Sequence, residues 1–217
     1  FSLQCEGKDW TLENKFLKES HSFTFRDKST INFEPLDWIG RQVQEDLIIL
    51  SPSSNLVAGQ LCFPSGWSLD EKFGKHFLEL HAPLPSLMGP MLQAADKVIE
   101  RIPVGKPIAR TNWGFRVSDQ LDLSSRHGMA YRKSLEEVAV RLEAEDAGDH
   151  LFLRIERQTL SRLPMSGHVL FTIHTYNNLV ADEIKDIKRL EGMLSFLKTV
   201  PPELFEYKQM APFAKTL

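Results

Sequence analysis

Residues 151–176 read LFLRIERQTLSRLPMSGHVLFTIHTY, and this stretch decides the fold. Segments 151–160 and 168–176 are rich in aliphatic, aromatic and β-branched residues, which favour strands. Between them, segment 163–167 (Leu-Pro-Met-Ser-Gly) has the proline and glycine of a turn. The pattern therefore predicts an antiparallel hairpin.

The second strand of this hairpin has two different faces, because side chains alternate along a strand. One face is plainly apolar and the other is chemically mixed. The apolar set is Val169, Phe171 and Ile173, and the mixed set is Leu170, Thr172, His174 and Tyr176. We expect a core on one side of the sheet and polar chemistry on the other.

Outward from this hairpin, the chain alternates between strand and helix patterns. A second hairpin is predicted from the apolar segments 46–51 and 56–63 around the turn-prone segment 52–55, and a further strand at 107–117. Ser68 and Glu71 have the spacing of a helical capping box. Helical periodicity predicts helices at 35–43, 89–102, 134–145 and 181–197, whereas residues 1–35 have no firm pattern.

The order of these elements is a hairpin, helices, about three antiparallel strands and a last helix, which indicates an α+β fold. The 26 basic and 29 acidic side chains give a net charge of -3 without a basic cluster, so nucleic acid is not an expected partner. No apolar segment is long enough to span a membrane and no signal peptide is recognisable, so we expect a cytoplasmic protein.

Cofactor motifs are few. Cys5 and Cys62 are too far apart and too few for an iron–sulfur cluster or a disulfide framework, and we expect free thiols. Neither GxGxxG nor GxxxxGK[ST] occurs, so the sequence has no recognisable site for a dinucleotide or a nucleotide. Electrons for any redox chemistry would come from elsewhere.

Several ordered motifs resemble the haem-binding alpha subunit of the haem-dependent oxidative N-demethylase family, and the element order resembles a PAS domain. Most of the motifs lie between residues 35 and 176. They are VQEDL at 43–47, CFPSGW at 62–67, EKFGK at 71–75, HAPLP at 81–85, RTNW at 110–113, RIERQTLSRLP at 154–164 and FTIHTY at 171–176, and Tyr207-Lys208 also fits.

The resemblance implies a PAS-like antiparallel sheet with helices inserted between strands 2 and 3, and helical additions at both termini. Residues 1–217 would form a single haem-binding domain, with a core at about 43–178, an N-terminal extension at 1–42 and a C-terminal helical region at 179–217.

The activity that the resemblance implies is oxidation by a haem-dependent oxidoreductase of monooxygenase type. This chain would hold haem b through an axial histidine and convert dimethylamine to methylamine and formaldehyde with O2. Partner subunits would bring NADPH, FMN and an iron–sulfur cluster. Two positions depart from the family pattern, His174 where Arg is common and Leu84 where Val is more usual. The identity of the amine is therefore left open.

His81 is the candidate axial ligand of the haem iron. It lies in the segment LHAPLP at 80–85, where two prolines would hold the loop rigid and fix the direction of the imidazole. The alternative is a histidine at a helix end that bonds a backbone carbonyl. His76 is five residues earlier, diverges from His81 on a helix, and is expected at the surface.

Glu156 is the candidate group for binding a protonated amine. A carboxylate buried without a partner costs several kcal/mol, so Glu156 must be paired or must face a wet cavity. Beside a haem it would attract a secondary ammonium, with Tyr176 or Trp113 as an aromatic wall. The alternative is an ordinary cross-strand Glu–Arg pair. His174 is a candidate distal group or second ligand, or a hydrogen-bonded histidine of the sheet.

Three arginines, Arg154, Arg157 and Arg162, are candidates for contacts to the haem propionates, because a guanidinium binds a carboxylate with two hydrogen bonds. Asn112 and Trp113 interrupt a strand with one amide and one large ring. That pair suits a pocket wall, and it equally suits a strand end that packs on a helix.

Two other functions fit the same residues. A PAS-like domain that binds haem without catalysis would be a haem or gas sensor, although no recognisable output segment follows the sheet. A scaffold that retained the fold and lost the cofactor is the third possibility. The absorption spectrum of the purified chain and amine-dependent consumption of NADPH distinguish the three.

Overall fold

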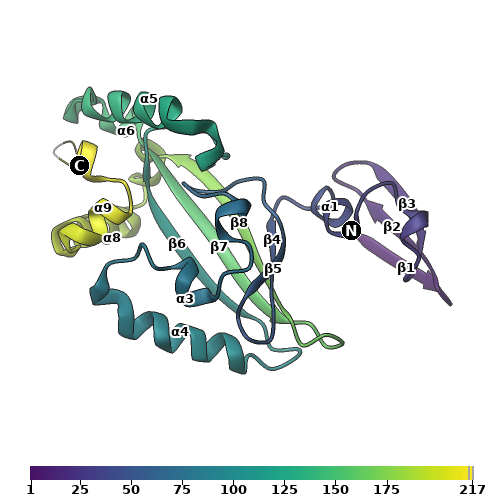
Figure 1. Cartoon of the computed structure of the whole chain (residues 1–217). Helices are drawn as coiled ribbons and strands as arrows, with labels where there is room; N and C mark the ends of the chain where they lie inside the picture. The colour runs from purple at the N-terminus through teal and green to yellow at the C-terminus, as the bar shows by residue number, and fades with distance from the viewer. Residues whose placement is uncertain (215, 217) are drawn as a thin grey trace.

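The computed structural model describes residues 1–214 and 216 and contains two separate antiparallel sheets (Figure 1). The smaller sheet is formed by β1 (Ser2–Glu6), β2 (Asp9–Asn14) and β3 (Glu19–Thr24), in that order. The larger sheet is formed by β4 (Asp46–Leu50), β5 (Leu56–Gln60), β6 (Ile108–Arg116), β7 (Phe152–Arg162) and β8 (Val169–Leu179). The fold class is therefore α+β, as the element order predicts.

The larger sheet has the strand order β5-β4-β8-β7-β6. Its long central hairpin, β7 and β8, pairs continuously from Phe152 opposite Leu179 to Arg162 opposite Val169. The hairpins predicted at 46–63 and 151–176 are both confirmed. Because β4 pairs with β8, the first strand of the sheet lies beside the last one, and β6 is an edge strand.

Nine α-helices surround the sheets in the described residues 1–214 and 216. Three short ones, α1 (Pro35–Gly40), α2 (Leu69–Lys72) and α3 (Phe77–Leu80), precede the longer α4 (Gly89–Arg101). The others are α5 (Gly128–Val140), α6 (Ala147–His150), α7 (Val180–Glu183), α8 (Ile187–Thr199) and α9 (Pro202–Tyr207). The capping box of Ser68 and Glu71 begins α2 as predicted.

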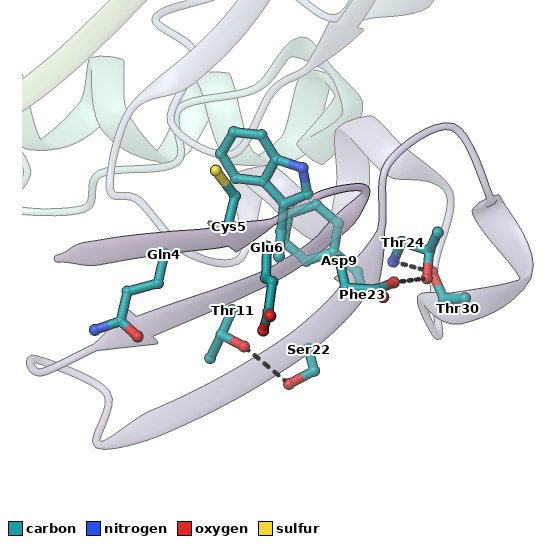
Figure 2. A pocket seen from close by; sticks show the side chains of 10 residues that line it. Gln4, Cys5, Glu6, Asp9, Thr11, Ser22, Phe23, Thr24 and Thr30 are labelled. Carbon is teal, nitrogen blue, oxygen red and sulfur yellow. Dashed lines mark hydrogen bonds between the residues drawn. The ribbon is translucent and has the colours of Figure 1, made fainter.

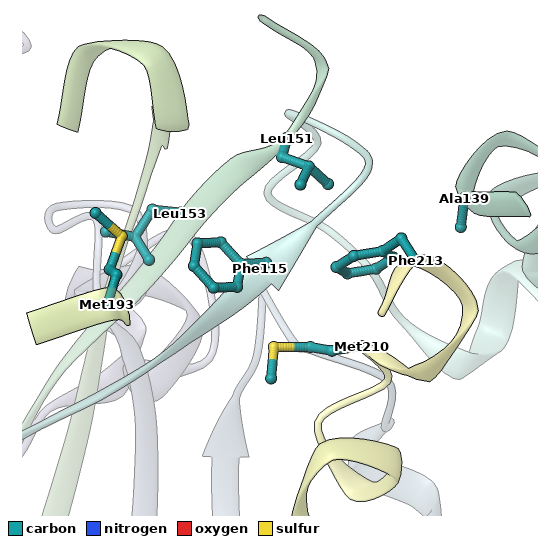
Figure 3. Close-up of a cluster of buried hydrophobic side chains, with 7 residues drawn as sticks. All are labelled: Phe115, Ala139, Leu151, Leu153, Met193, Met210 and Phe213. Carbon is teal, nitrogen blue, oxygen red and sulfur yellow. The ribbon is translucent and has the colours of Figure 1, made fainter. Parts of the chain in front are cut away.

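The larger sheet has a core on each face, because its strands alternate apolar side chains in both directions. One face, here called the α4 face, packs Ile48, Leu160 and Val169 against Ile99 and Ile102 at the end of α4. The opposite face, here called the α8 face, packs against α5, α8 and the C-terminal turn (Figure 3). Its buried residues are Phe115, Ala139, Leu151, Leu153, Met193, Met210 and Phe213.

The N-terminal addition is a β-meander followed by the short helix α1, so in its described residues the helix predicted at 35–43 is the only α-helix and most of the addition is not helical. Strands β1 and β2 turn at Gly7, whose φ of +64° favours glycine. The meander lies beyond the β4–β5 edge of the larger sheet, on the far side from α5, α8 and α9 (Figure 1). Most of its residues are exposed, and an exposed short sheet has little of the apolar alternation by which strands are identified.

Two C-terminal helix predictions need correction. The helix expected at 134–145 runs from Gly128 to Val140, and the apolar side chains of Val138 and Val140 are exposed. The helix expected at 181–197 is two helices, because Asp186 accepts hydrogen bonds from the N–H groups of Lys188 and Arg189 and starts α8 anew. A capping aspartate competes with a continuous helix for these N–H groups.

Two further expectations concern the two cysteines and membrane-spanning helices. Cys5 and Cys62 are exposed free thiols, as predicted. Among the described residues, every helix is too short or too polar to cross a lipid bilayer.

Candidate functional site

His81 lies immediately after α3 and its ring has a fixed orientation. Its Nδ1 is 2.8 Å from the backbone oxygen of Phe77, and the two rings stack with centroids 4.4 Å apart. Because a carbonyl oxygen only accepts, Nδ1 carries the proton and donates it. Burial lowers the pKa of His81, and the neighbouring cations Lys72 and Arg110 lower it further. The imidazole is therefore neutral, with its lone pair on Nε2.

The local sequence explains why His81 is held in place. The side chain of His76 accepts a hydrogen bond from the N–H of Leu78 and begins α3. At the other end of α3, Lys72 Nζ donates to the oxygen of Leu80 at 2.7 Å. The backbone N–H of Leu84 then donates to the oxygen of His81 at 2.9 Å, so the segment closes as a turn. His76 is a helix cap, on the surface as expected.

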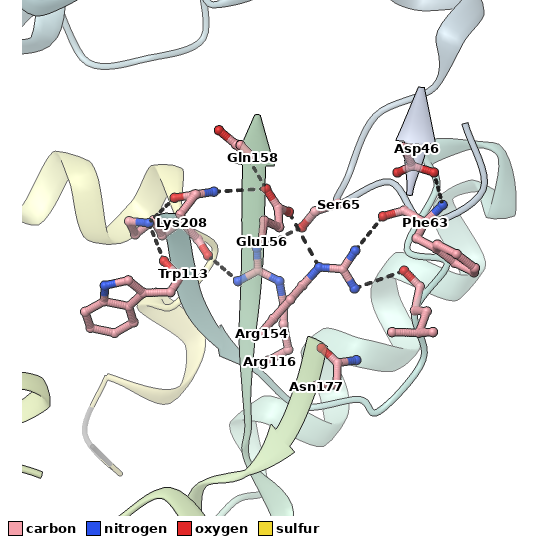
Figure 4. Close-up of polar contacts among 12 residues, drawn as sticks. Asp46, Phe63, Ser65, Trp113, Arg116, Arg154, Glu156, Gln158, Asn177 and Lys208 are labelled. Carbon is pink, nitrogen blue, oxygen red and sulfur yellow. Dashed lines mark hydrogen bonds and ion pairs between the residues drawn. The ribbon is translucent and has the colours of Figure 1, made fainter. Parts of the chain in front are cut away.

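Glu156 is the centre of a polar cluster on the α4 face of β6 and β7 (Figure 4). Its Oε2 accepts hydrogen bonds from Asn112 Nδ2 at 3.3 Å and from Gln158 Nε2 at 3.0 Å. Its Oε1 lies 3.7 Å from Arg154 Nε, and the side chain is 13% exposed. Of the two predicted alternatives, a pair or a wet cavity, the structure has the pair, although the partner Arg154 is on the same strand and not across from Glu156.

Arg154 is 2% exposed and ties two loops to the sheet. Its terminal nitrogens donate to the backbone oxygens of Phe63 at 2.6 Å and of Leu121 at 2.9 Å. Asp46, fully buried at the start of β4, accepts the N–H groups of Cys62 and Phe63 through Oδ1, and burial raises its pKa. Arg154 therefore positions the loop that follows β5, and its charge is shared between Glu156 and Asp46.

Lys208, just after α9, reaches back to the edge strand β6. Its Nζ donates to Trp113 O at 2.5 Å and to Asn112 Oδ1 at 3.2 Å. Arg116 donates to the backbone oxygen of Lys208 at 2.9 Å and to Ser65 Oγ at 2.9 Å. Burial, with repulsion from Arg116 and Arg110, lowers the pKa of Lys208 to about 8.

The family model described as haem-dependent oxidative N-demethylase, alpha subunit-like, matches residues 1–217 of this chain. The match covers the whole sequence. The chain belongs to this family. The resemblance carried by the ordered motifs is thereby confirmed, and haem dependence and oxidative N-demethylation are the properties for which the family is named.

In this N-demethylase-like chain, the predicted site residues fall on two sides of the larger sheet. His174 pairs with Arg157 across β7 and β8, whereas Glu156 pairs with Thr175. Because successive side chains point to opposite faces, His174 and Tyr176 lie on the α8 face and Glu156 on the α4 face. These residues were predicted to share one site, and the strands separate them.

On the α8 face, His174 Nδ1 is 3.1 Å from Glu45 Oε1, and its ring lies 4.4 Å from that of Tyr176. Tyr176 is 42% exposed and Arg157 is also exposed. These contacts are those of a hydrogen-bonded histidine in the sheet, which was one of the three interpretations of His174.

Trp113 lies on the α8 face as well, with its ring centroid 4.6 Å from that of Phe196 in α8 and 5.8 Å from that of Phe115. Its ring is thus part of a strand end that packs on a helix. The neighbouring Asn112 points the other way, into the Glu156 cluster, and bridges Glu156 and Lys208.

Arg162 binds the end of α4 and the β7–β8 turn. Its guanidinium donates to the backbone oxygens of Ile102 and Gly167 at 2.6 Å, and to those of Ile99 and Glu100 at 2.8 Å. The donors of Arg162 are therefore occupied by carbonyls, as most of those of Arg154 are. A carboxylate ligand would have to displace these bonds.

The chemistry of His81, on the α4 face, is that of a candidate axial ligand of a haem. A porphyrin supplies the equatorial ligands of its iron, so the protein needs one imidazole with a free nitrogen, and His81 Nε2 meets that need. Among the described residues there is no group of three or more His, Cys, Asp or Glu side chains placed to hold a metal ion. A haem does not require one.

Two cavities in the described residues lie away from His81 and Glu156. The first, about 580 Å³, is in the N-terminal meander and is lined by residues such as Cys5, Trp10 and Phe23 (Figure 2). The second, about 490 Å³, lies between α5 and the turn before α6. Neither is lined by any of the predicted site residues.

Sequence reasoning missed Lys208 and Arg116 as part of the Glu156 cluster. Arg116 ends a strand pattern as an ordinary surface arginine would, and Lys208 is 52 positions from Glu156 (208 minus 156). The only signal for Lys208 was the short Tyr207-Lys208 match to the family pattern.

Proposed function

We propose that this chain is the haem-binding subunit of an oxidative N-demethylase and that His81 is the axial ligand of its haem b. The observation that carries this proposal is the hydrogen bond from His81 Nδ1 to the oxygen of Phe77. Histidines that bind metals commonly donate their second N–H to a backbone carbonyl, which fixes the tautomer and the ring direction. The same bond also fits a structural histidine at a helix end, so the metal has to be tested directly.

The proposed fold is PAS-like, with residues 1–217 forming one haem-binding unit and the core at about 43–178. The order of the larger sheet, counted from β4 as strand 1, is 2-1-5-4-3, and α2, α3 and α4 lie between its second and third strands. The haem would lie on the α4 face, which these helices cover.

Glu156 is the proposed binding group for the amine. A small secondary amine is a cation at neutral pH, and Glu156 Oε1 accepts no hydrogen bond from the described residues. An ammonium N–H could donate to that oxygen while Asn112 and Gln158 hold Oε2, so the carboxylate would keep its position when the amine binds.

In the proposed reaction a dimethylamine-like substrate, O2 and electrons from NADPH give a primary amine and formaldehyde. The haem, when bound, supplies the activation of O2. This chain orients the amine through Glu156 and limits the access of water to the α4 face. Partner subunits carrying FMN and an iron–sulfur cluster would deliver the electrons.

The haem proposal is tested by titrating the purified chain with haemin and recording the Soret band. His81→Ala should weaken haem binding by more than about tenfold, because even second-shell partners of metal ligands are worth about 10–100-fold. Added imidazole should restore the band in His81→Ala by occupying the space of the missing ring. His174→Ala is the matched control and should bind haem as the unchanged chain does.

An unchanged spectrum in His81→Ala would remove His81 as the ligand, and loss of the band in His174→Ala would move the iron to the α8 face. The activity is tested by combining the chain with its reductase partners, NADPH and dimethylamine under air. Formaldehyde should appear, and NADPH consumption should depend on the amine. Haem binding without amine-dependent consumption would favour a sensor.

A further inference from the structure

Three cations crowd one edge of the α4 face. Arg110 and Arg116 are both on this face of β6, and Lys208 lies beside them. Burial, with repulsion from Arg154, lowers the pKa of Arg116 to about 10, and burial, with repulsion from Arg116 and Arg110, lowers that of Lys208 to about 8. Glu156 is the one carboxylate that raises both pKa values, and it already faces Arg154. The β6 edge of the α4 face therefore carries a net positive charge, and water is partly excluded from it.

Donors at this edge are still available for a ligand. The ammonium of Lys208 has three N–H groups, and the described residues accept two of them. Arg116 Nε is buried without an acceptor among the described residues. Arg110 is exposed, and in the part of the chain that the structure describes no carboxylate pairs with it. The positive charge, the unused donors of Lys208 and Arg110 and the unpaired Nε–H of Arg116 are suited to binding an anion.

Arg110 also connects this edge to His81. Its charge acts to lower the pKa of His81 as well as those of Lys208 and Tyr207, so it affects both the candidate axial ligand and the C-terminal segment. An anionic group on a ligand bound at His81 would be attracted by the charge of Arg110.

We propose that Arg110 and Lys208, with the charge of Arg116 behind them, form a carboxylate-binding site that holds the propionate groups of the haem. This assignment rests on the function proposed above. It differs from the sequence-based expectation, since Arg154 and Arg162 donate mainly to backbone carbonyls and Arg157 lies on the α8 face. A guanidinium and an ammonium with free donors bind a carboxylate more readily than ones that must first release a carbonyl.

The test compares haem b with its dimethyl ester, in which both propionates are neutral. Dissociation rates are measured by transfer to an excess of a haem scavenger, with the Soret band as the signal. Arg110→Gln and Lys208→Met should each raise the rate for haem b by about tenfold, the typical value of a charge-assisted hydrogen bond. Neither substitution should change the rate for the ester. Arg157→Gln, on the opposite face, is the control and should change neither rate.

Equal effects of Arg110→Gln and Lys208→Met on haem b and on the ester would overturn the carboxylate site, because a loss of packing or of stability does not depend on the ligand's charge. The absence of any effect of both substitutions would overturn it too. In either case a retained Soret band would leave the proposed haem function intact, so the two failures are distinguishable.

A second measurement does not depend on catalytic activity. In the haem-free chain, the pKa of Lys208 is followed by NMR of lysines labelled at Cε, with Lys208→Met to assign the signal. It should start near the value of about 8 and rise when haem b is added, since a carboxylate favours the ammonium. A rise with free glutarate but not with haem b would overturn the assignment to haem, and no rise with either would overturn the site altogether.

Discussion

Arginines of this chain have different structural roles, and their hydrogen-bond partners show which role each one has. Arg154, Arg157 and Arg162 share the motif at 154–164, yet one is buried between loops, one is exposed on the α8 face and one caps α4. From the sequence alone, each of the three arginines is an equal candidate for binding a carboxylate. The sequence cannot predict whether the donors meet a carbonyl or a ligand, because the carbonyls come from residues up to 91 positions away along the chain.

Arg162 should matter for stability and not for the cofactor. Replacing it by Met removes hydrogen bonds to the oxygens of Ile99, Ile102 and Gly167 and leaves these carbonyls without their donor. We expect a loss of about 2–3 kcal/mol in the free energy of unfolding, the range for charged hydrogen bonds. Urea denaturation measures the loss, and the affinity of the folded chain for haem should stay unchanged. A drop in haem affinity at unchanged stability would instead assign Arg162 to the propionates.

The surroundings of two site residues, Glu156 and His174, were predictable in part. The carboxylate of Glu156 in an apolar strand required a partner, and the structure provides Arg154, Asn112 and Gln158. The separation of Glu156 from His174 followed from strand alternation only once the register was known. With Glu156 opposite Thr175, the side chain of His174 points to the other face.

At the level of elements, strands were predicted better than helix ends. Both hairpins of the larger sheet have long apolar segments and strong turn residues, and their bounds agree with the sequence pattern to within a few residues. The segment 181–197 has a continuous helical stripe, and yet Ile184 and Ile187 are exposed at the break before α8. The N-cap at Asp186 starts a new helix despite the continuous apolar pattern, because the cap bonds backbone N–H groups and does not depend on the apolar side chains.

Asp186 should therefore be worth about 1 kcal/mol to the free energy of unfolding, the typical value of an N-cap. Asp186→Ala leaves the N–H groups of Lys188 and Arg189 without their acceptor. Asp182→Ala is the matched control, since Asp182 forms only an exposed pair with Lys185 and should cost less than about 0.5 kcal/mol. Thermal or urea unfolding of both variants gives the comparison. Equal losses in the two variants would show that α8 does not depend on its cap.

On the scale of the whole molecule, the chain has a large sheet with cores on both faces and a small sheet that shares neither core. No residue of the meander occurs in the two hydrophobic clusters of the described residues. It is attached to the rest through Asn14, whose amide donates to the backbone and side-chain oxygens of Gln42, and through Trp38 of α1 against Phe23. The sequence pattern predicted the large sheet because burial imposes periodicity, and it missed the meander because little of it is buried.

Such a molecule should open in two steps, and Asn14 is the residue that tests it. Asn14 is 1% exposed, and its Oδ1 also accepts the N–H groups of Phe16 and Leu17. Asn14→Ala should lower the free energy of local opening of β1–β3 by about 1–3 kcal/mol, the cost of unpaired buried groups. Hydrogen exchange should accelerate in β1–β3 and remain slow in β7 and β8, where the paired amides do not depend on Gln42. Faster exchange in β7 and β8 by the same factor would mean that both sheets unfold as one cooperative unit.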